Sequence, residues 1–503
     1  MTDVLAARAP ADGSLDVDVV HELLSSQFDV VLGTPRVVRR SRLDTFDGRL
    51  ARAGRQLRHV TETSDERLEL VGDGETFLLS LGPEKPRWPA MASSLPPGPV
   101  RDEVARLAGI RALMVHDEGR RLVRQAELRN TDRKIVVRLV VDEPADGASG
   151  EPPTVLVRRL RGYDKEAARA WALVTTVLEP VTDPVADQPV DGGPARVDPA
   201  SPGRVLLATE LLEFLAAIRV NLPGTVDDVD TEFLHDLRVA VRRTRSVLKL
   251  GREVLPEQWR TRWEPEFKWL GDLTTPVRDL DVHQLELPQM AGWLVAARPE
   301  DLTAFEWHLS RRRTAERRLL LRGLRGKRLR SVLADWDAAV RAVLAEPEAP
   351  GPTAGQLAVA HLSRAHRRVV RAGSRIGSQS AAEDLHVLRK RGKELRYALE
   401  VFEPVLDPAD AAKAVRDLKE LQDVLGRFQD SEVQRATLRT FASEMVADGV
   451  EVPTLLAMGE LVAHLDQEQQ SARAEFDRVF ARYVRPASAR RMARLYAEGG
   501  GGR

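Results

Sequence analysis

The chain has 503 residues, 43% of them hydrophobic, which is enough for roughly two to four domains with sizeable cores. Its 76 lysines and arginines balance 76 aspartates and glutamates, so a polyanionic partner would have to be held by local clusters of charge. The absence of cysteine excludes disulfides and thiolate metal sites, and it suits a reducing compartment.

The first residues, MTDVLAARAPADG, lack the basic region and apolar run of a signal peptide. The most apolar stretch, 205–218, is interrupted by Glu210 and Glu213, and no segment reaches the ~20 apolar residues that span a bilayer. We therefore expect a cytoplasmic protein with no membrane partner.

Residues 1–180 mix two periodicities. Short stretches rich in Val, Leu and Ile, separated by turn residues, predict antiparallel strands at 66–72, 76–81, 134–143 and 154–163. Longer stretches with helical spacing predict helices at 102–113 and 164–179. The first part of the chain should therefore be an α+β domain.

Prolines then mark a boundary, because six of them fall within 180–202 among few apolar residues. This composition predicts a linker over 181–202, between a first domain at 1–180 and a second at 203–498. After the linker, Ala, Leu, Arg and Glu dominate with helical spacing, and strand signals are absent. The second domain should be all-α.

The helical part contains an internal repeat at a shift of 151 residues. The segment FLHDLRVAVRRTR at 233–245 falls on DLHVLRKRGKELR at 384–396, and the match continues without a gap to Val282 and Val433. A register of this length indicates a tandem duplication. We predict two pseudo-symmetric repeats, at about 203–345 and about 355–498.

Each copy places basic residues on one face of a helix. At ~100° per residue, the cations of the first copy fall within an arc of ~80° and form a ridge ~20 Å long beside an apolar stripe. We call these two sets the first and second ridges. The candidate anion-binding residues are His235, Arg238, Arg242, Arg245 and Lys249 in the first ridge, and His386, Arg389, Lys390, Lys393 and Arg396 in the second.

Such a ridge can simply be a solvated helix face. We expect the ridges to bind an anion instead, because the repulsion between like charges occurs in both copies. In addition, no acid on the ridges should form an ion pair with an arginine four residues away. Other segments are also basic: 311–330 has ten lysines and arginines with one acid, and 361–375 has five arginines with none. In the latter, Arg364, Arg368 and Arg371 share one face and join the candidate set.

The segments LHDLRVAVRRTR and LHVLRKRGKELRYALE, with PVRDLDV at 276–282 and LGRFQDSEV at 425–433, resemble the CHAD family, the conserved histidine α-helical domain. The resemblance covers about 205–495. It implies a bundle of two pseudo-symmetric halves around a basic channel, and binding of inorganic polyphosphate without catalysis or a cofactor. The histidines could donate to phosphate or brace the bundle.

The chemistry of the ridges agrees with this ligand. Arginine forks fit phosphate oxygens, and lysine adds a point charge. The ridges contain one aromatic residue, Tyr397, which is too few to stack the bases of a single-stranded nucleic acid. Polyphosphate is therefore the expected partner, and proteins of polyphosphate granules are further expected partners.

The segment RLDTFDGRLARAGRQLRH at 42–59 resembles the CYTH family of triphosphate tunnel proteins. This implies an antiparallel β-barrel whose basic lumen binds triphosphate. Arg55, Arg58 and Arg138 either line such a lumen or are cations of the barrel surface. Active members open with a Glu-x-Glu-x-Lys strand that holds a divalent metal, and residues 1–40 lack it. The pair Asp142 and Glu143 is a weak metal signal, so we expect neither a metal site nor catalytic residues.

Two alternatives stay open at this point. One is a metal-dependent triphosphatase or polyphosphatase that uses the N-terminal barrel, with the helical part supplying its substrate. A weaker one is non-specific binding of nucleic acid through the same ridges. The missing Glu-x-Glu-x-Lys strand argues against the first, and the lack of an aromatic platform argues against the second.

Overall fold

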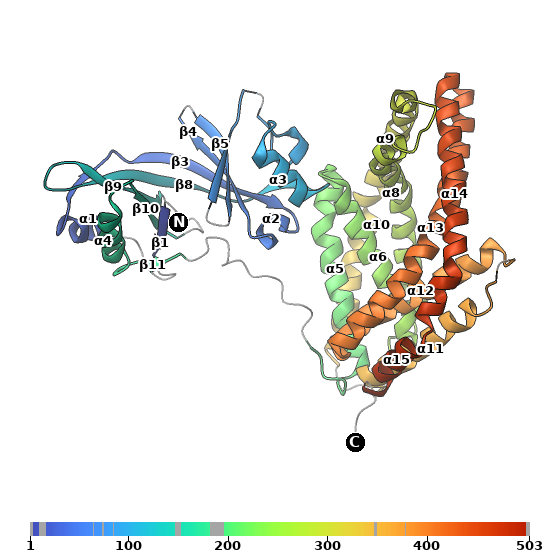
Figure 1. The fold of residues 1–503 in the computed structure, drawn as a ribbon. Helices are drawn as coiled ribbons and strands as arrows, with labels where there is room; N and C mark the ends of the chain where they lie inside the picture. The colour runs from blue at the N-terminus through green and yellow to red at the C-terminus, as the bar shows by residue number, and fades with distance from the viewer. Residues whose placement is uncertain are drawn as a thin grey trace. The chain divides into compact units, whose positions relative to one another are not determined.

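The computed structural model describes residues 4–9, 17–63, 65–72, 75–83, 85–145, 152–181, 196–346, 350–377 and 379–498. The chain divides into two compact units, Met1–Gly192 and Gly193–Arg503 (Figure 1). Of the expected linker at 181–202, residues 182–195 lie outside the described residues.

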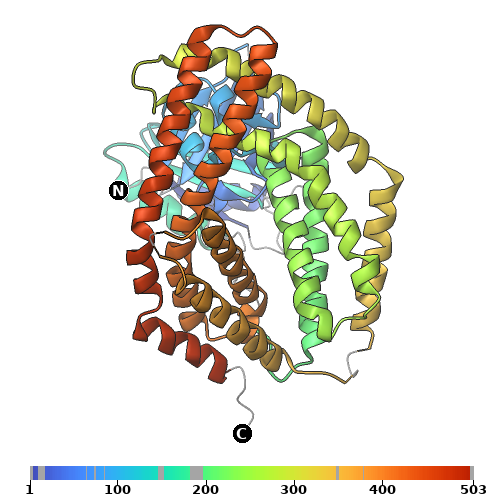
Figure 2. The ribbon, with the colours of Figure 1, turned by 90° about the vertical axis from the view of Figure 1, so that its right-hand side faces the viewer.

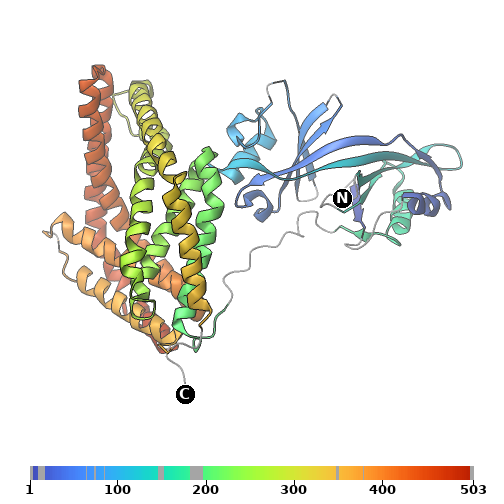
Figure 3. The ribbon, with the colours of Figure 1, turned by 180° about the vertical axis from the view of Figure 1, so that it is seen from behind.

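The N-terminal unit is built on one antiparallel sheet with the strand order β11-β1-β10-β9-β8-β3-β4-β5-β6, while β2 and β7 also pair with β8. Its long strands β3 and β8 are visibly curved (Figure 3). The strands are β1 (Val4–Arg8), β2 (Asp29–Leu32), β3 (Arg36–Thr45), β4 (Gln56–Glu62), β5 (Asp65–Gly72), β6 (Glu75–Ser80), β7 (Ala90–Met91), β8 (Ala112–Arg129), β9 (Ile135–Pro144), β10 (Thr154–Arg159) and β11 (Glu179–Pro180).

Helices accompany two apolar cores of this unit. One core joins apolar side chains of β1, β8, β9 and β10 to those of α1 (Val17–Ser25) and α4 (Asp164–Val174). The other joins β3, β4 and β5 to α2 (Arg49–Arg52), η1 (Ala92–Ser94) and α3 (Pro99–Ala108). The α+β prediction is confirmed. The expected barrel is present as a curved sheet whose outer strands, β6 and β11, each pair with one neighbour among the described residues.

Two local predictions differ from the structure. The helix expected at 102–113 begins at Pro99 and ends at Ala108, because Gly109 adopts a φ of 60° and β8 begins at Ala112. The long strand β8 was not expected, since its sequence, ALMVHDEGRRLVRQAELR, carries charges along most of its length.

The C-terminal unit is helical, as predicted. Its helices are α5 (Gly203–Asp227), α6 (Thr231–Leu250), α7 (Trp259–Arg262), α8 (Glu264–Ala291), α9 (Thr303–Leu324), α10 (Lys327–Leu344), α11 (Ala354–Gly373), α12 (Ala382–Phe402), α13 (Pro408–Ala447), α14 (Val452–Tyr483) and α15 (Pro486–Glu498). Short 3₁₀ turns lie at η2 (Gly251–Glu253), η3 (Pro299–Leu302) and η4 (Glu403–Val405). None of the helices described is both long and apolar enough to cross a membrane.

The duplicated sequence gives two similar sets of helices. In the first set α5, α6, α8, α9 and α10 follow one another, and α11 to α15 take the same order in the second. The pairs α5–α6 and α11–α12 pack in equivalent ways, as do α8–α9 and α13–α14. The two sets lie side by side in the unit, the first in green to gold and the second in orange to red (Figure 2).

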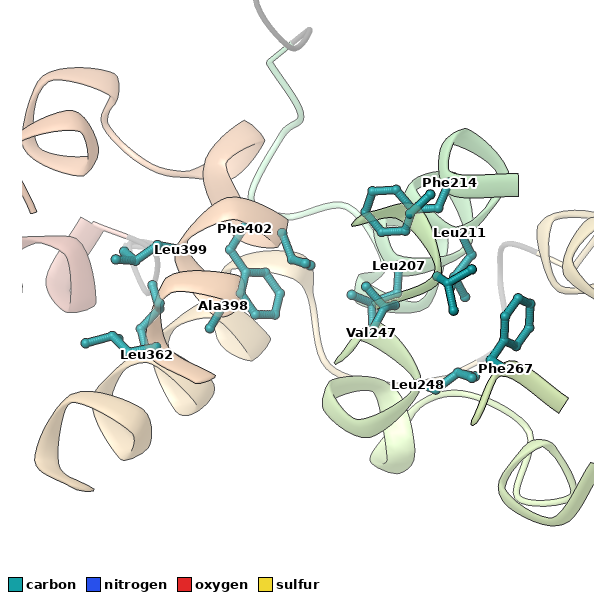
Figure 4. Packing of buried hydrophobic residues seen from close by; sticks show 14 of the residues in the cluster. Leu207, Leu211, Phe214, Val247, Leu248, Phe267, Leu362, Ala398, Leu399 and Phe402 are labelled. Atoms are coloured by element: carbon teal, nitrogen blue, oxygen red, sulfur yellow. The ribbon is translucent and has the colours of Figure 1, made fainter. Parts of the chain in front are cut away.

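The apolar stripes of α6 and α12 face the interior. Leu237 of α6 and its counterpart Leu388 of α12 are both fully buried. One cluster of buried residues extends across both repeats, and Figure 4 shows Val247 and Leu248 of α6 on one side of it and Leu399 of α12 on the other. Because the stripes occupy the interior, the neighbouring ridges are left at the helix margins.

Residues 196–202 belong structurally to the helical unit. The amide of Val197 donates to the carbonyl of Pro404 at 3.0 Å, and the amide of Ala354 donates to the carbonyl of Ser201 at 2.8 Å. These bonds tie the entrance of the first repeat to the second. The final residues of the expected linker are therefore anchored, and the boundary with the helical unit lies before Arg196.

Candidate anion-binding site

The first ridge is positioned by the start of α6. Asp230 caps this helix, and its carboxylate accepts hydrogen bonds from the amides of Glu232 and Phe233 at 2.9 and 3.2 Å. Leu234 and Leu237 are buried and fix the rotation of the helix. The cations of the first ridge therefore lie next to the buried stripe and beside α8.

Arg238 is fixed by neutral acceptors on α8. Its Nη1 donates to the carbonyl of Gly271 at 3.1 Å and to the hydroxyls of Thr274 and Thr275, each at 2.9 Å. Burial lowers the pKa of this guanidinium, while nearby Asp279 opposes that shift. The side chain stays charged and is oriented without an ion pair among the described residues.

Arg245 also lies over α8. A Cβ at Gly271 would come within 3.3 Å of the Nη1 of Arg245, so this glycine leaves room for the guanidinium. In the part of the chain that the structure describes, the side chains of Arg242, Arg245 and Lys249 have no hydrogen-bond or ion-pair partner. Their charge is available to an external anion.

The second ridge is held differently. Arg389 forms an ion pair with Asp430 of α13 at 2.8 Å, and Arg396 forms one with Glu400 at 2.7 Å. The expectation that no acid on a ridge pairs with an arginine four residues away is therefore wrong for the second copy. The Arg396 side chain is half exposed, so this pair contributes little to stability and an incoming anion can compete with it.

The two histidines have different surroundings. The Nδ1 of His386 lies 2.7 Å from the Oε1 of Gln429, and since this oxygen can only accept, Nδ1 carries the proton. The position equivalent to Gln429 in the first repeat is Arg278. Burial, followed by the charge of Arg278, lowers the pKa of His235.

The structure brings the two ridges together. Burial and then the charges of its neighbours, including Arg242 of the other repeat, lower the pKa of Lys393. Lys393 lies 151 positions after Arg242, so these residues are equivalent in the duplication. These equivalent residues are near enough for their charges to interact across the boundary between the repeats.

A second contact crosses the same boundary. Arg243 of α6 forms an ion pair with Glu400 of α12 at 3.2 Å, and its guanidinium also lies 5.9 Å from the ring centre of Phe214. This pair links α6 and α12 across the boundary between the repeats. The cations of both ridges can therefore act on a single ligand.

The remaining candidates are more peripheral. Arg364 of α11 lies 3.7 Å from Glu253, an acid of the first repeat. Arg368, Arg371 and Lys390 are exposed, and none has a partner within the described ranges. The structure thus places α11 next to α12 without drawing its arginines into the contact between Arg242 and Lys393.

Part of the basic segment 311–330 has a structural role that sequence reasoning missed. Arg313 forms ion pairs with Asp228 at 2.7 Å and with buried Asp281 at 2.6 Å, and Arg317 contacts Asp228 at 2.9 Å. This network lines a small polar cavity between α5, α6, α8 and α9. The alternation of basic and apolar residues in α9 gave no signal for these partners, because the acids lie about 30 and 85 positions away.

In the N-terminal unit, Arg42 and Arg58 are cross-strand neighbours, and Arg138 is opposite Arg158. Strand alternation places these arginines on the sheet face opposite the apolar cores. Arg55 was expected with them, but it precedes β4 and lies 3.7 Å from Glu103 of α3, a helix packed on the other face.

Of the two acids that gave a weak metal signal, Asp142 is already engaged. Asp142 is buried and lies 2.7 Å from both Arg40 and Arg121. Glu143 follows it in the same strand, so the two carboxylates point to opposite faces. Among the described residues, no group of three acids, histidines or cysteines is close enough to hold a metal ion.

Comparisons with known proteins agree with this geometry in the helical unit. Residues 209–439 match the model of the CHAD domain. The uncharacterized protein Rv2226 of Mycobacterium tuberculosis strain H37Rv is 28% identical over 295 residues, which is 58% of this chain and 54% of the relative. The uncharacterized protein MT2285 of strain CDC 1551 gives the same values, so the chain spans about half the length of the curated relatives it matches.

Solved structures resemble parts of the chain weakly. The CHAD domain of the plant Ricinus communis has a TM-score of 0.44 at 20% identity, and covers 62% of this chain and 98% of that one. PptA of Streptomyces chartreusis has a TM-score of 0.43 at 19% identity, over 56% and 99%. A Bacillus halodurans protein named as an adenylate cyclase candidate has a TM-score of 0.26 at 14% identity, over 38% and 95%. The match to the CHAD domain model therefore lies within the helical unit, at residues 209–439.

Proposed function

We propose that the helical unit binds inorganic polyphosphate through both ridges and does not catalyse its turnover. The ion pair between Arg243 of α6 and Glu400 of α12 carries this proposal, because it joins the helices of both ridges at one boundary, where the charge of Arg242 also acts on Lys393. Like charges so arranged repel one another, and a bound chain of phosphates relieves that repulsion. Arg238, oriented by three neutral acceptors, supplies a directed guanidinium beside them.

The ligand is a flexible polyanion for two reasons. Tyr397 is the one aromatic residue among the cations of the ridges, and Phe233 of α6 and Phe402 of α12 are buried, so bases would find no stacking surface. Arg242 and Lys390 are long exposed side chains, and Lys393 reaches the surface although its neighbours partly desolvate it, so all three can follow the repeating charge of a phosphate chain. We also propose that the chain accompanies stored polyphosphate in granules, which imaging of the tagged protein in polyphosphate-rich cells would test.

Titration of the full chain with long-chain polyphosphate at low salt tests the proposal. We expect saturable binding that weakens steeply as salt is raised, because neutralised phosphates release counterions. Duplex DNA at equal phosphate concentration serves as competitor. Absence of binding at low salt, or complete displacement by DNA, would contradict polyphosphate as the ligand.

We further propose that the N-terminal unit does not hydrolyse phosphate chains. Residues 1–40 lack the paired glutamates that would hold a metal, and Asp142 is engaged by Arg40 and Arg121. Tripolyphosphate with Mg²⁺ or Mn²⁺ should therefore yield phosphate at the background rate. Release well above background that EDTA abolishes would overturn this.

A further inference from the structure

The corner between α9 and α10 carries cations that the ridges do not include. Arg318, Arg322 and Arg325 follow one face at the end of α9, spaced by four and three residues, and Lys327 and Arg330 begin α10. We call these five residues the α9–α10 patch. All five side chains are exposed.

The patch is free of partners. The basic segment 311–330 divides in two: Arg311, Arg312, Arg313 and Arg317 pair with acids, and Arg328 pairs with Glu266. Within the described residues, none of the five patch side chains has a hydrogen bond or an ion pair. The unpaired residues are therefore gathered at the corner instead of being scattered along the segment.

Acids near the corner are engaged by other cations. Glu266 of α8 lies 2.8 Å from Arg328 and 3.8 Å from Arg262, and Asp335 of α10 lies 3.3 Å from Arg262. Arg328 also lies 4.1 Å from the ring centre of Trp269. These contacts lock Arg262 and Arg328, and they leave the patch charge uncompensated.

Helix electrostatics accounts for part of the patch. Arg322 and Arg325 stand at the C-terminal end of α9, where cations are favourable. Lys327 and Arg330 stand in the first turns of α10, where the helix dipole disfavours cations, and the first turn of α10 has no acid. The chain thus carries a local electrostatic cost at this corner that an external anion would offset.

The patch is separate from the ridges. Helix α10 packs against α5 and α9 of its own repeat. Figure 2 shows the α9–α10 corner at the outer edge of the first repeat, on the side away from the second. A ligand confined to the contact between Arg242 and Lys393 would not reach it.

We propose that the α9–α10 patch is a second contact for polyphosphate, engaged only by chains longer than the ridges can hold. This rests on the proposed function. The patch offers charge without an exposed aromatic surface or a pocket, which suits the same repeating polyanion. Once one part of a long chain is bound at the ridges, its remainder is present at high effective concentration, so even weak patch contacts raise the overall affinity.

The test compares two chain lengths and two variants of the full-length protein. The patch variant is Arg322→Glu, Arg325→Glu, Lys327→Glu. The control variant is Arg416→Glu, Lys419→Glu, Arg439→Glu, which has the same change in charge at exposed positions of α13. A short polyphosphate of about one ridge length, ~20 Å, should occupy the ridges alone. Affinity is measured across a salt series, and circular dichroism confirms that each variant is folded.

For long chains we expect the patch variant to bind about tenfold more weakly, with the slope of log affinity against log salt reduced by about 2, since three phosphate contacts are lost. Short chains should bind the patch variant and the parent equally, and the control variant should match the parent for both lengths. A milder variant, Arg325→Gln with Lys327→Gln, should show a smaller loss of affinity for long chains. It provides the test if the triple variant does not fold.

Other outcomes separate the two proposals. If long chains bind the patch variant like the parent, the second contact is wrong while the proposed function stands. If short chains also lose affinity in the patch variant, the patch is no separate site and the inference fails. If duplex DNA loses affinity and long polyphosphate does not, the patch serves nucleic acid and the inference is overturned. If the parent binds neither length, the proposed function itself fails.

Discussion

The two ridges arose from one sequence pattern, yet the structure gives them different partners. In the first, Arg238 is held by a carbonyl and two hydroxyls, and Arg242 and Arg245 have no partner among the described residues. In the second, Arg389 and Arg396 are paired with Asp430 and Glu400. Neutral acceptors orient a guanidinium and leave its charge intact. Carboxylates orient it and also neutralise its charge. The first ridge should therefore contribute more to binding a polyanion.

The largest expected effect comes from reversing each ridge in turn. Arg238→Glu, Arg242→Glu, Arg245→Glu should weaken binding of long-chain polyphosphate at least about 100-fold, because charged hydrogen bonds are worth ~1.5–3 kcal/mol each. Arg389→Glu, Lys393→Glu, Arg396→Glu should weaken it about 10- to 30-fold, since two of these cations are partly neutralised. Titration at low salt measures both.

Circular dichroism should show that both triple variants keep their helices, because the ridges lie beside the apolar stripes and not within them. Equal losses in the two variants would mean that the acidic partners do not matter. A normal affinity in either variant would end the model of one shared site.

A double-mutant cycle on Arg242 and Lys393 tests whether the ridges meet on one ligand. Each single change to alanine should weaken binding about tenfold, the effect of ~1.4 kcal/mol. If both cations contact the same phosphates, the loss of binding free energy in the double variant should differ from the sum of the two single losses by at least ~0.5 kcal/mol. Strict additivity would indicate that the two residues bind separate segments. The pair Arg416→Ala and Arg439→Ala, exposed on α13 and outside both ridges, provides the additive control.

Removing an acid should strengthen the second ridge. Glu400 pairs with Arg396 and with Arg243 of the other repeat, so Glu400→Gln frees charge on both. Polyphosphate should bind this variant about threefold more tightly, a gain of ~0.6 kcal/mol that matches the modest value of exposed ion pairs. Glu394→Gln, which frees Arg391 outside the ridges, is the control. Weaker binding of Glu400→Gln would show that the pair with Arg243 is needed for placement of the helices.

The smallest expected effect is a pH dependence from the first ridge. Burial and nearby Arg278 lower the pKa of His235 below its usual value, so this side chain is neutral in the free protein near pH 7. A bound phosphate chain would raise the pKa of His235, so the complex takes up a proton that the free protein does not hold. The affinity for polyphosphate therefore increases as the pH falls from the pKa of His235 in the complex to its lower pKa in the free protein. We expect a two- to threefold gain between about pH 7.5 and 6, lost in His235→Gln. An unchanged pH profile in that variant would exclude His235 as the source.

Much of the helical architecture could be predicted from the sequence. The spacing of Leu234 and Leu237 gave the buried stripe of α6, and the shift of 151 residues gave the second copy. These features are local or repeated, so periodicity alone reveals them. The strand β8 was missed for the opposite reason: it is charged along most of its length, and only its pairing with β3 and β9 makes it a strand.

The candidate site divides in the same way. Sequence by itself determined which residues form each cationic ridge, because helical geometry fixes which side chains share a face. Only the tertiary structure decided that the charge of Arg242 acts on Lys393 and that Arg389 is paired with Asp430. It also decided that Arg313 is paired, while the Arg322 side chain has no partner among the described residues. These partners lie on helices that are distant in sequence. The interaction between two charges depends on their distance in space, and the sequence pattern does not contain that distance.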